Sequence, residues 1–297
     1  MNKSNIYDKI NNQVLEGLEK EGLNWFRPWK SGQGNQPMNY SSGKFYRGFN
    51  IFMLNFEMVD KEYEYNQWMT YKQAQAKGGN VKTGSKSTDI YFYKVSYQHK
   101  VTGEFSDTPT GNAKDWRQTF AMRYFKVFNI AQTEGLEPLP VEEFEPTEDQ
   151  SGEMAQSLTD TYLNRENISF SPFGDSAFYS PSRDHIEMPP LENFCDSDSY
   201  YKTLFHEMAH STGHEDRLKR ATLMDVSHWG DNTYSKEELV AEISAMYLVG
   251  LLGLEPQDST FNSQAYIKGW CRHLRDKSKE CVNAMQQATK VVEFIQG

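Results

Sequence analysis

His206, Glu207 and His210 are the residues whose types and spacing point most directly to chemistry. They form an HExxH sequence, and residues 200–212 around it predict a helix that ends at Gly213. Residues four apart share one face of a helix, so both imidazoles point the same way and can bind zinc or another divalent ion. Glu207 lies beside them, where it can accept a proton from a water on that ion. We therefore expect His206 and His210 as metal ligands and Glu207 as the catalytic base.

A catalytic zinc site needs a third protein ligand and keeps one position open for water. Residues 234–252 predict a second helix with Ser235 as its N-cap, and Glu238 and Glu242 share a face of it. One of the two can bind the metal while the other accepts a hydrogen bond from a ligand histidine. We expect Glu238 to be the ligand and Glu242 the supporting group, with one Zn²⁺ or other divalent metal per chain.

Two other arrangements fit the same residues. Ser235-x-x-Glu238 also matches a capping box, in which Glu238 would cap its own helix. Asp216 stands at the metzincin spacing after the HExxH motif, where a third histidine is usual. His214 is compatible with either scheme, as a group that supports a ligand or the transition state. The pair of helical motifs favours Glu238.

The elements around the motif agree with a metallopeptidase site. An apolar stripe on the first helix would bury it against a core and hold the histidines rigid. Residues 176–186 have the turn residues and apolar ends of a short hairpin. The constellation resembles the site of a gluzincin-type zinc metallopeptidase, and that resemblance implies an edge strand lining a peptide cleft. The stripe consists of Leu204, Phe205, Met208 and Ala209.

Charge is distributed unevenly along the 297 residues. The net charge is −10, but residues 1–130 contain 18 Lys and Arg against 12 Asp and Glu, which gives +6. The remaining residues hold 13 and 29, which gives −16. Such asymmetry predicts two domains with different partners. The stretch 133–152 is acidic, contains three prolines and has no periodicity, so we expect domains at 1–132 and 153–297 joined by a linker at 133–152.

Cysteine content and hydropathy exclude several classes of protein. The three cysteines show no CxxC spacing, so neither a disulfide framework nor a cysteine-based zinc site is indicated. The first residues lack the apolar stretch of a signal peptide, and no run of 18 apolar residues occurs. We expect a cytoplasmic protein with no membrane partner.

The basic N-terminal half is rich in aromatic residues that alternate with cations. Its patterns predict a helix over 6–20, a helix over 70–77, and strands around 91–93 and 123–130, an α+β mixture. Aromatic faces stack on unpaired bases while cations follow phosphates, so the mixture suits single-stranded nucleic acid. Aromatic residues also fill cores, and composition alone leaves that alternative open. Our candidates are Trp29, Tyr46 and Trp68 for stacking, and Arg27, Lys44, Arg47, Lys72, Lys82 and Lys86 for phosphates.

Several separate segments resemble ArdC-type antirestriction proteins over nearly the whole chain. Those similar to their N-terminal domain are Trp25–Trp29, Asn39-x-x-Ser-Gly43-Lys-x-Tyr46-Arg47-Gly48-x-Asn50, Trp68-x-Thr-x-x-Gln73-Ala74, Gly79-x-Val-Lys-x-Gly84 and Lys126-Val-Phe-Asn129-x-x-Gln132. Those similar to their metallopeptidase domain are His206-Glu-x-x-His210-x-Thr-Gly213-His214-x-x-Arg217-Leu-x-Arg220 and Glu237-Glu238-Leu-Val-Ala-Glu242. The resemblance implies a two-domain α+β protein: an N-terminal α+β DNA-binding domain and a C-terminal zincin-like (gluzincin-type) metallopeptidase domain. It also implies a protein of conjugative plasmids that binds single-stranded DNA and protects incoming DNA from host restriction.

Two functions from different classes follow. In the first, the DNA-binding protein carries a peptidase that acts on a host protein such as a restriction component. In the second, the protein is a non-enzymatic binding module whose metal is structural, and its acidic half blocks a host enzyme. A structural site needs no general base, so Glu207→Gln separates the two. A metal-dependent nuclease is disfavoured, because nucleases commonly use carboxylate-rich two-metal sites.

Overall fold

The structure is a computed structural model, and it describes residues 3–22, 36–140, 146–224, 232–257, 269–272, 274–275 and 277–297. The chain divides into two compact units. Unit 1 comprises Met1–Pro37, Phe45–Asp60 and Pro140–Gly297, and unit 2 comprises Met38–Lys44 and Lys61–Leu139. Helices and sheets occur together in the chain, so the expected α+β class is confirmed.

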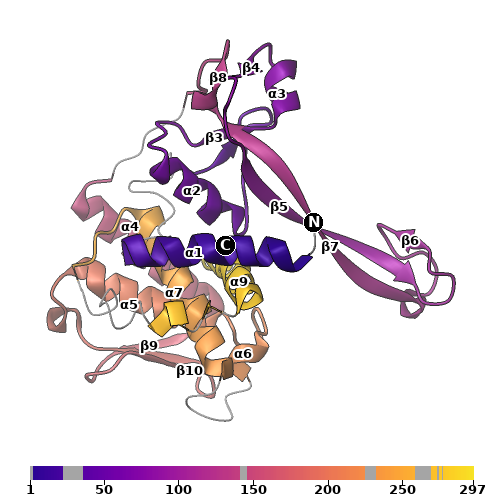
Figure 1. Ribbon diagram of the computed structural model, residues 1–297. Helices are drawn as coiled ribbons and strands as arrows, with labels where there is room; N and C mark the ends of the chain where they lie inside the picture. The colour runs from indigo at the N-terminus through magenta and orange to yellow at the C-terminus, as the bar shows by residue number, and fades with distance from the viewer. Residues whose placement is uncertain are drawn as a thin grey trace. The chain divides into compact units, whose positions relative to one another are not determined.

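Unit 2 is built on an antiparallel ribbon of two long strands (Figure 1). In the six-stranded sheet the order is β2-β1-β3-β7-β5-β6, and a separate pair joins β4 to β8. Thr70 starts helix α3 with a capping box, because its side chain accepts from the Gln73 amide while Gln73 reaches back. The strands are β1 (Met38–Asn39), β2 (Lys44–Phe45), β3 (Gln67–Met69), β4 (Asn80–Val81), β5 (Thr88–His99), β6 (Phe105–Ser106), β7 (Trp116–Asn129) and β8 (Thr133–Glu134). The helices are α3 (Tyr71–Ala76), η3 (Ala113–Asp115) and η4 (Ile130–Gln132).

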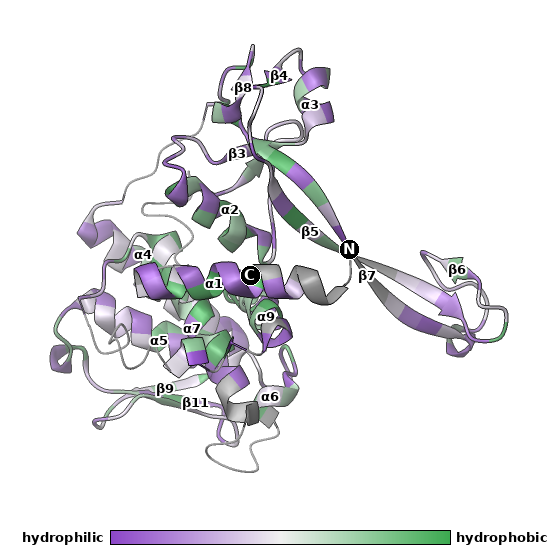
Figure 2. Cartoon of the chain, in the orientation of Figure 1, coloured by the Kyte–Doolittle hydropathy of each residue, from purple (hydrophilic) through white to green (hydrophobic). Residues whose placement is uncertain are grey.

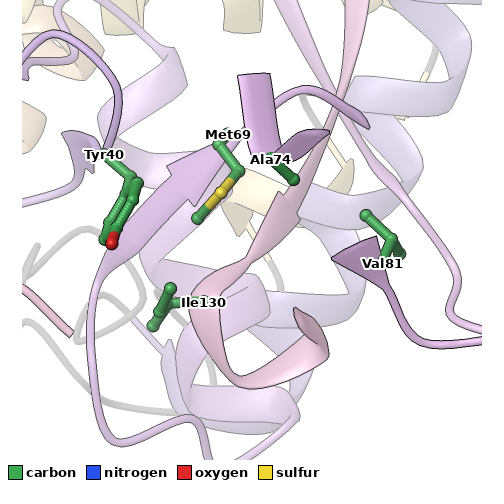
Figure 3. Close-up of a cluster of buried hydrophobic side chains, with 5 residues drawn as sticks. All are labelled: Tyr40, Met69, Ala74, Val81 and Ile130. Carbon is green, nitrogen blue, oxygen red and sulfur yellow. The ribbon is translucent and has the colours of Figure 1, made fainter. Parts of the chain in front are cut away.

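A small core holds the end of the sheet against α3 in unit 2 (Figure 3). Leu136 and Leu139, both in the predicted linker, pack against this core, and the Gln67 side chain donates to the Leu139 carbonyl over 2.7 Å. The linker expected at 133–152 is therefore corrected at its start. Leu136 and Leu139 are partly buried against this core although they belong to no helix or strand, so the absence of periodicity did not mark them as part of unit 2. The core consists of Tyr40, Met69, Ala74, Val81 and Ile130.

Unit 1 is mainly helical and contains a three-stranded sheet of order β10-β11-β9. Strands β10 and β11 are antiparallel, which confirms the hairpin expected at 176–186, and β9 runs parallel to β11. Helix α4 begins after Thr147, within the predicted linker. The end of the linker, expected at residue 152, is therefore also corrected. The helices are α1 (Lys3–Glu21), α2 (Asn50–Asp60), α4 (Glu148–Glu166), η5 (Leu191–Asn193), α5 (Ser197–Ser211), α6 (Ala221–Met224), α7 (Asn232–Leu252) and α9 (Ser278–Gln296). The strands are β9 (Ser169–Pro172), β10 (Phe178–Ser180) and β11 (His185–Met188).

Helix α1 belongs to unit 1 although it opens the chain. Its hydrophilic and hydrophobic residues alternate along the helix (Figure 2), and Ile10, Val14 and Leu18 are buried where α1 packs against α9. The Asn11 side chain also donates to the Leu274 carbonyl over 2.8 Å. Residues 1–132 therefore do not form one compact unit. The amphipathic pattern predicts the helix and its buried face, but it carries no information about which segment covers that face.

In the part of the chain that the structure describes, no helix combines the length and apolar character needed to cross a bilayer.

Candidate metal centre

Helix α5 carries the HExxH motif and is fixed firmly at its start and along one side. Asp196 is its N-cap and accepts a hydrogen bond of 2.7 Å from the Ser199 amide. The predicted apolar stripe is buried throughout, since each of its side chains is at most 1% exposed. Burial of that stripe immobilises the helix, so the motif's side chains project from a rigid backbone. The stripe is Leu204, Phe205, Met208 and Ala209.

The structure brings His206, His210 and Glu238 together at the packed pair of helices α5 and α7. The two Nε2 atoms lie 3.1 Å apart. The Glu238 carboxylate lies 3.4 Å from His206 Nε2 and 3.2 Å from His210 Nε2. Within the described ranges, these three form the group of His, Cys, Asp and Glu side chains close enough to share a metal ion.

The dimensions of this group fit a tetrahedral metal. With metal–nitrogen and metal–oxygen bonds of about 2.0–2.1 Å, two ligands of a tetrahedral zinc are separated by roughly 3.3 Å. The Nε2–Nε2 separation is 3.1 Å, and the two oxygens of Glu238 approach the histidines to similar distances, 3.2 Å from Oε1 to His210 and 3.4 Å from Oε2 to His206. Two imidazole nitrogens and one carboxylate also form the donor set of a catalytic zinc site. The side chains of His206, His210 and Glu238 are 15%, 11% and 24% exposed, so the group opens to solvent on one side.

Each histidine has a carboxylate at its outer nitrogen. His206 Nδ1 lies 3.2 Å from Glu242, and His210 Nδ1 lies 3.4 Å from Glu237. Partners of this kind fix the orientation and tautomer of metal-binding imidazoles. Glu242 was expected in this role from its spacing, whereas Glu237 was missed. Its direct sequence neighbour, Glu238, fits the helical face on its own, so nothing in the spacing drew attention to Glu237.

A buried arginine holds Glu237. Arg220 Nε lies 3.2 and 3.1 Å from the two carboxylate oxygens, and its guanidinium also donates to the Ala209 carbonyl at the end of α5 over 2.7 Å. Burial alone would raise the pKa of Glu237, but hydrogen bonds from His210 and Arg220 lower that pKa to about 2. Glu237 is therefore ionised at neutral pH, and Arg220 connects the end of α5 to the carboxylate that orients His210.

Acidic groups dominate the electrostatics of the two imidazoles. Burial lowers the pKa of His206, yet its contacts with Glu238 and Glu242 hold that pKa well above its usual value. Burial also lowers the pKa of His210, but its contacts with Glu237 and Glu238 raise that pKa to about 9. Burial raises the pKa of Glu238, but its contacts with His206 and His210 hold that pKa well below its usual range. A surplus of negative charge around two imidazoles is a setting that attracts a divalent cation.

Lys202 lies one helical turn before His206 and is also buried. Its ammonium is 3.9 Å from Glu242, whose side chain is 1% exposed. Glu242 therefore stands between a buried cation and the outer nitrogen of His206. This lysine was missed from the sequence, because a cation on a helix is ordinarily solvated.

The loop after α5 is tied to the β10–β11 turn. Arg217 donates 3.0 Å hydrogen bonds to Asp184 and to the Tyr179 hydroxyl, and its Nε donates to the Ser211 carbonyl over 2.7 Å. Although burial opposes it, hydrogen bonds from Arg217 and Tyr179 hold the pKa of Asp184 below its usual range. The hairpin is thereby fixed to the end of the helix that carries the motif.

The two other arrangements that the sequence allowed can be compared with the positions of Asp216, His214 and Ser235. Asp216 is 83% exposed, and its side chain lies 3.6 Å from His214. Neither Asp216 nor His214 belongs to the ligand-type group found in the described residues. Helix α7 begins at Asn232, two residues before the predicted range, so Ser235 lies within the helix and the predicted N-cap is wrong. The capping-box interpretation of Glu238 fails with it.

The predicted nucleic-acid contacts are only partly accessible. Tyr46 is 7% exposed and Trp68 is fully buried, with its indole nitrogen donating to Asn66 over 2.6 Å, so both predictions of a stacking role are wrong. These rings fill cores, which was the alternative that composition left open. Arg27 and Trp29 lie outside the described residues. The predicted phosphate contacts that the structure describes are all exposed, namely Lys44, Arg47, Lys72, Lys82 and Lys86.

Two family models match the chain in the order that the sequence predicts. Residues 4–128 match the N-terminal domain of anti-restriction factor ArdC, and residues 158–287 match a zincin-like metallopeptidase domain. The two-domain expectation is thereby confirmed.

Curated relatives span nearly all of the chain. It is 31% identical over 303 residues to DNA primase TraC of Escherichia coli, covering 99% of this chain and 27% of that protein. The chain thus spans about a quarter of the length of TraC. It is also 27% identical to the uncharacterised protein y4eC of Sinorhizobium fredii (strain NBRC 101917 / NGR234), covering 98% of this chain and 92% of that one.

Two solved structures share the fold. Both are of the antirestriction ArdC protein from the R388 plasmid, and each covers 98% of this chain and 96% of the other. The metal-free structure has a TM-score of 0.70 at 28% identity, and the Mn(II)-bound structure has 0.69 at 29% identity. One of these two structures of the relative contains Mn(II), and residues 158–287 of this chain match a zincin-like metallopeptidase domain.

Proposed function

The chain belongs to the ArdC-type antirestriction proteins, and from this premise we propose that it binds single-stranded DNA and carries a zinc-dependent peptidase. Through these activities it protects DNA that enters a cell by conjugation from host restriction. The observation that carries the peptidase part is the convergence of His206, His210 and Glu238 at tetrahedral spacing. The expected substrate is a host protein such as a restriction component.

In this proposal His206, His210 and Glu238 hold one Zn²⁺, and Glu207 is the general base. When bound, the metal supplies Lewis-acid chemistry that lowers the pKa of water and polarises a carbonyl. Glu207 is 7% exposed and lies on the same helix as both histidines, so it is held close to the place where a proton must be taken up. Its carboxylate accepts that proton and returns it to the leaving amine.

The other charged groups position the ligands. Glu237 and Glu242 keep the two imidazoles turned toward one point, while Arg220 and Lys202 compensate the buried charges of these carboxylates. No substrate contact is required of any of them. We therefore expect substitutions of these four residues to change metal affinity and stability.

The open side of the group favours a catalytic over a structural metal. Structural zinc sites are closed by four protein ligands, whereas catalytic sites have three and leave one position accessible. Three ligand-type side chains converge among the described residues, and Glu238 is about a quarter exposed.

A conjugation assay tests the proposed function. Plasmid transfer into restricting and non-restricting recipients is compared for donors that supply wild type, Glu207→Gln or Glu215→Gln. Glu215 is exposed and follows the same helix, so its variant is a matched control. We expect wild type and Glu215→Gln to protect and Glu207→Gln to lose protection. Full protection by Glu207→Gln would favour the binding-module alternative.

A further inference from the structure

Unit 2 exposes its aromatic rings at a place that the sequence patterns did not indicate. Phe92 on β5 and Phe125 on β7 are each 46% exposed. Their ring centroids are 5.6 Å apart with planes at 74°. Large apolar rings are normally removed from water, so two adjacent exposed phenylalanines on one ribbon indicate a contact surface.

The register of the ribbon places arginines on the same face. Phe92 pairs with Arg123, Ile90 pairs with Phe125, and Gln98 pairs with Arg117. Side chains alternate between faces along a strand, so Phe92, Phe125, Arg123 and Arg117 share one face. Arg117 and Arg123 are both exposed. We call these four residues the ribbon patch.

The two faces of the ribbon differ in charge. Asp89 belongs to the opposite face, where it lies 3.2 Å from Lys126. The register places no Asp or Glu of β5 or β7 on the face of the ribbon patch. Unit 2 as a whole holds 12 Lys and Arg against 8 Asp and Glu, a net charge of +4. The patch thus combines two exposed rings and two exposed arginines on a face that carries no Asp or Glu of β5 or β7.

We propose that the ribbon patch is the surface on which this protein binds single-stranded DNA; the inference rests on the proposed function. Unpaired bases stack on Phe92 and Phe125, while Arg123 and Arg117 contact phosphates. Arg117 and Arg123 are six positions apart, about 20 Å along a strand, which is several nucleotides of bound DNA. A duplex binds less well, because its base faces are hidden inside the helix. Figure 1 shows β5 and β7 as a long ribbon, which presents its faces along its length.

Strand β7 supplies matched controls for each patch residue. Tyr124 adjoins both Arg123 and Phe125, and Lys126 adjoins Phe125. Both lie on the opposite face, and Tyr124 is 43% exposed. Tyr124→Ala removes a ring from the same strand, and Lys126→Gln removes a charge from it while also breaking the ion pair with Asp89. A general effect on unit 2 would therefore appear equally in the patch variants and in the controls.

The experiment measures the affinity of the full-length protein for a labelled oligothymidylate at several salt concentrations. We expect Phe92→Ala and Phe125→Ala to weaken binding by about 5- to 150-fold with the salt dependence unchanged. Arg123→Gln is expected to reduce the log–log salt slope by about 0.7. Tyr124→Ala and Lys126→Gln should bind like wild type. Phe125→Trp retains a stacking ring and should preserve affinity, which distinguishes lost stacking from a damaged fold.

Two further probes separate stacking from charge attraction. An abasic strand keeps the phosphates but lacks bases, so its weaker binding should be insensitive to Phe125→Ala. A duplex of the same length should bind less tightly than the single strand.

The possible outcomes separate the surface from the function. If the patch variants bind the oligonucleotide as tightly as wild type, the ribbon patch is not the binding surface, while the proposed DNA binding stands. The same conclusion follows if the control variants lose as much affinity as the patch variants. Equal affinity of wild type for duplex and single-stranded DNA would also overturn the ribbon patch as a stacking surface. If wild type binds no single-stranded DNA, both proposals fail.

Discussion

The metal centre of unit 1 and the ribbon patch of unit 2 hold their charged and aromatic groups in opposite surroundings. In the metal centre each imidazole faces carboxylates on both nitrogens, and Glu237 and Glu242 are almost completely buried beside Arg220 and Lys202. In the ribbon patch the rings and arginines are exposed on an open face. Buried polar groups require a full set of partners and become rigid, whereas exposed groups remain free to meet a ligand of variable sequence. The comparison suggests geometric precision for chemistry in one unit and tolerant binding in the other.

The largest effect is expected from removing a ligand. Glu238→Ala should lose the metal, with a fall in affinity beyond the roughly 10–100-fold that is typical of losing an outer partner. Asp216→Ala should bind metal like wild type, since that side chain is 83% exposed and lies outside the group. Metal content and affinity of the purified proteins check this. Retention by Glu238→Ala together with loss by Asp216→Ala would reverse the assignment.

The buried aromatic residues of the N-terminal half should affect stability and leave DNA contacts intact. Trp68→Ala removes a fully buried side chain and should lower the free energy of unfolding by about 3–5 kcal/mol. Phe125→Ala removes a ring that is 46% exposed and should cost much less. Denaturant unfolding of both variants measures the difference. An equal loss in the two would contradict the division between core rings and contact rings.

Glu237 should matter for metal affinity although it is not a ligand. Glu237→Gln keeps the shape but removes the charge that faces His210 and Arg220, so metal affinity should fall by roughly 10–100-fold. Lys236→Gln, the neighbouring substitution, breaks a partly exposed ion pair with Glu280 and should change stability by about 0–1 kcal/mol with no effect on metal affinity. Calorimetric titration with Zn²⁺ compares them. Indistinguishable affinities would remove the positioning role from Glu237.

The smallest expected effect is a pH dependence from Asp184. Its pKa is lowered in the folded protein by Arg217 and Tyr179, so its contribution to stability is present above the unfolded value and is lost as pH falls through the folded one. Asp184→Asn should therefore reduce the acid-induced loss of unfolding free energy below about pH 4. Parallel unfolding curves at several pH values test this. Equal slopes for the two proteins would show that the pair contributes nothing measurable.

The parts of this molecule that depend on local spacing could be predicted from sequence. The HExxH pair and the Glu238–Glu242 face follow from helical periodicity, and the 176–186 hairpin follows from its turn residues. Glu237, Arg220 and Lys202 could not be assigned in this way, because their partners depend on how α5, α7 and the intervening loop pack.

Alternating patterns of rings and cations also left the DNA contacts undetermined. The same composition describes Trp68 in a core and Phe125 on an open face, and only burial separates them. The capping residues Thr147 and Gln150 did carry a local signal for the start of α4, which the acidic and proline-rich surroundings obscured.

The most direct test of the peptidase claim is cleavage of an unfolded protein by the zinc-loaded chain. Casein serves as the probe, with oligothymidylate present, and new peptide ends are identified by mass spectrometry for wild type and Glu207→Gln at equal zinc content. We predict cleavage by wild type and a rate lower by about 10²–10⁴-fold in Glu207→Gln, because the general base is removed while the ligands remain. Equal cleavage by the two proteins, or none by wild type, would contradict the account.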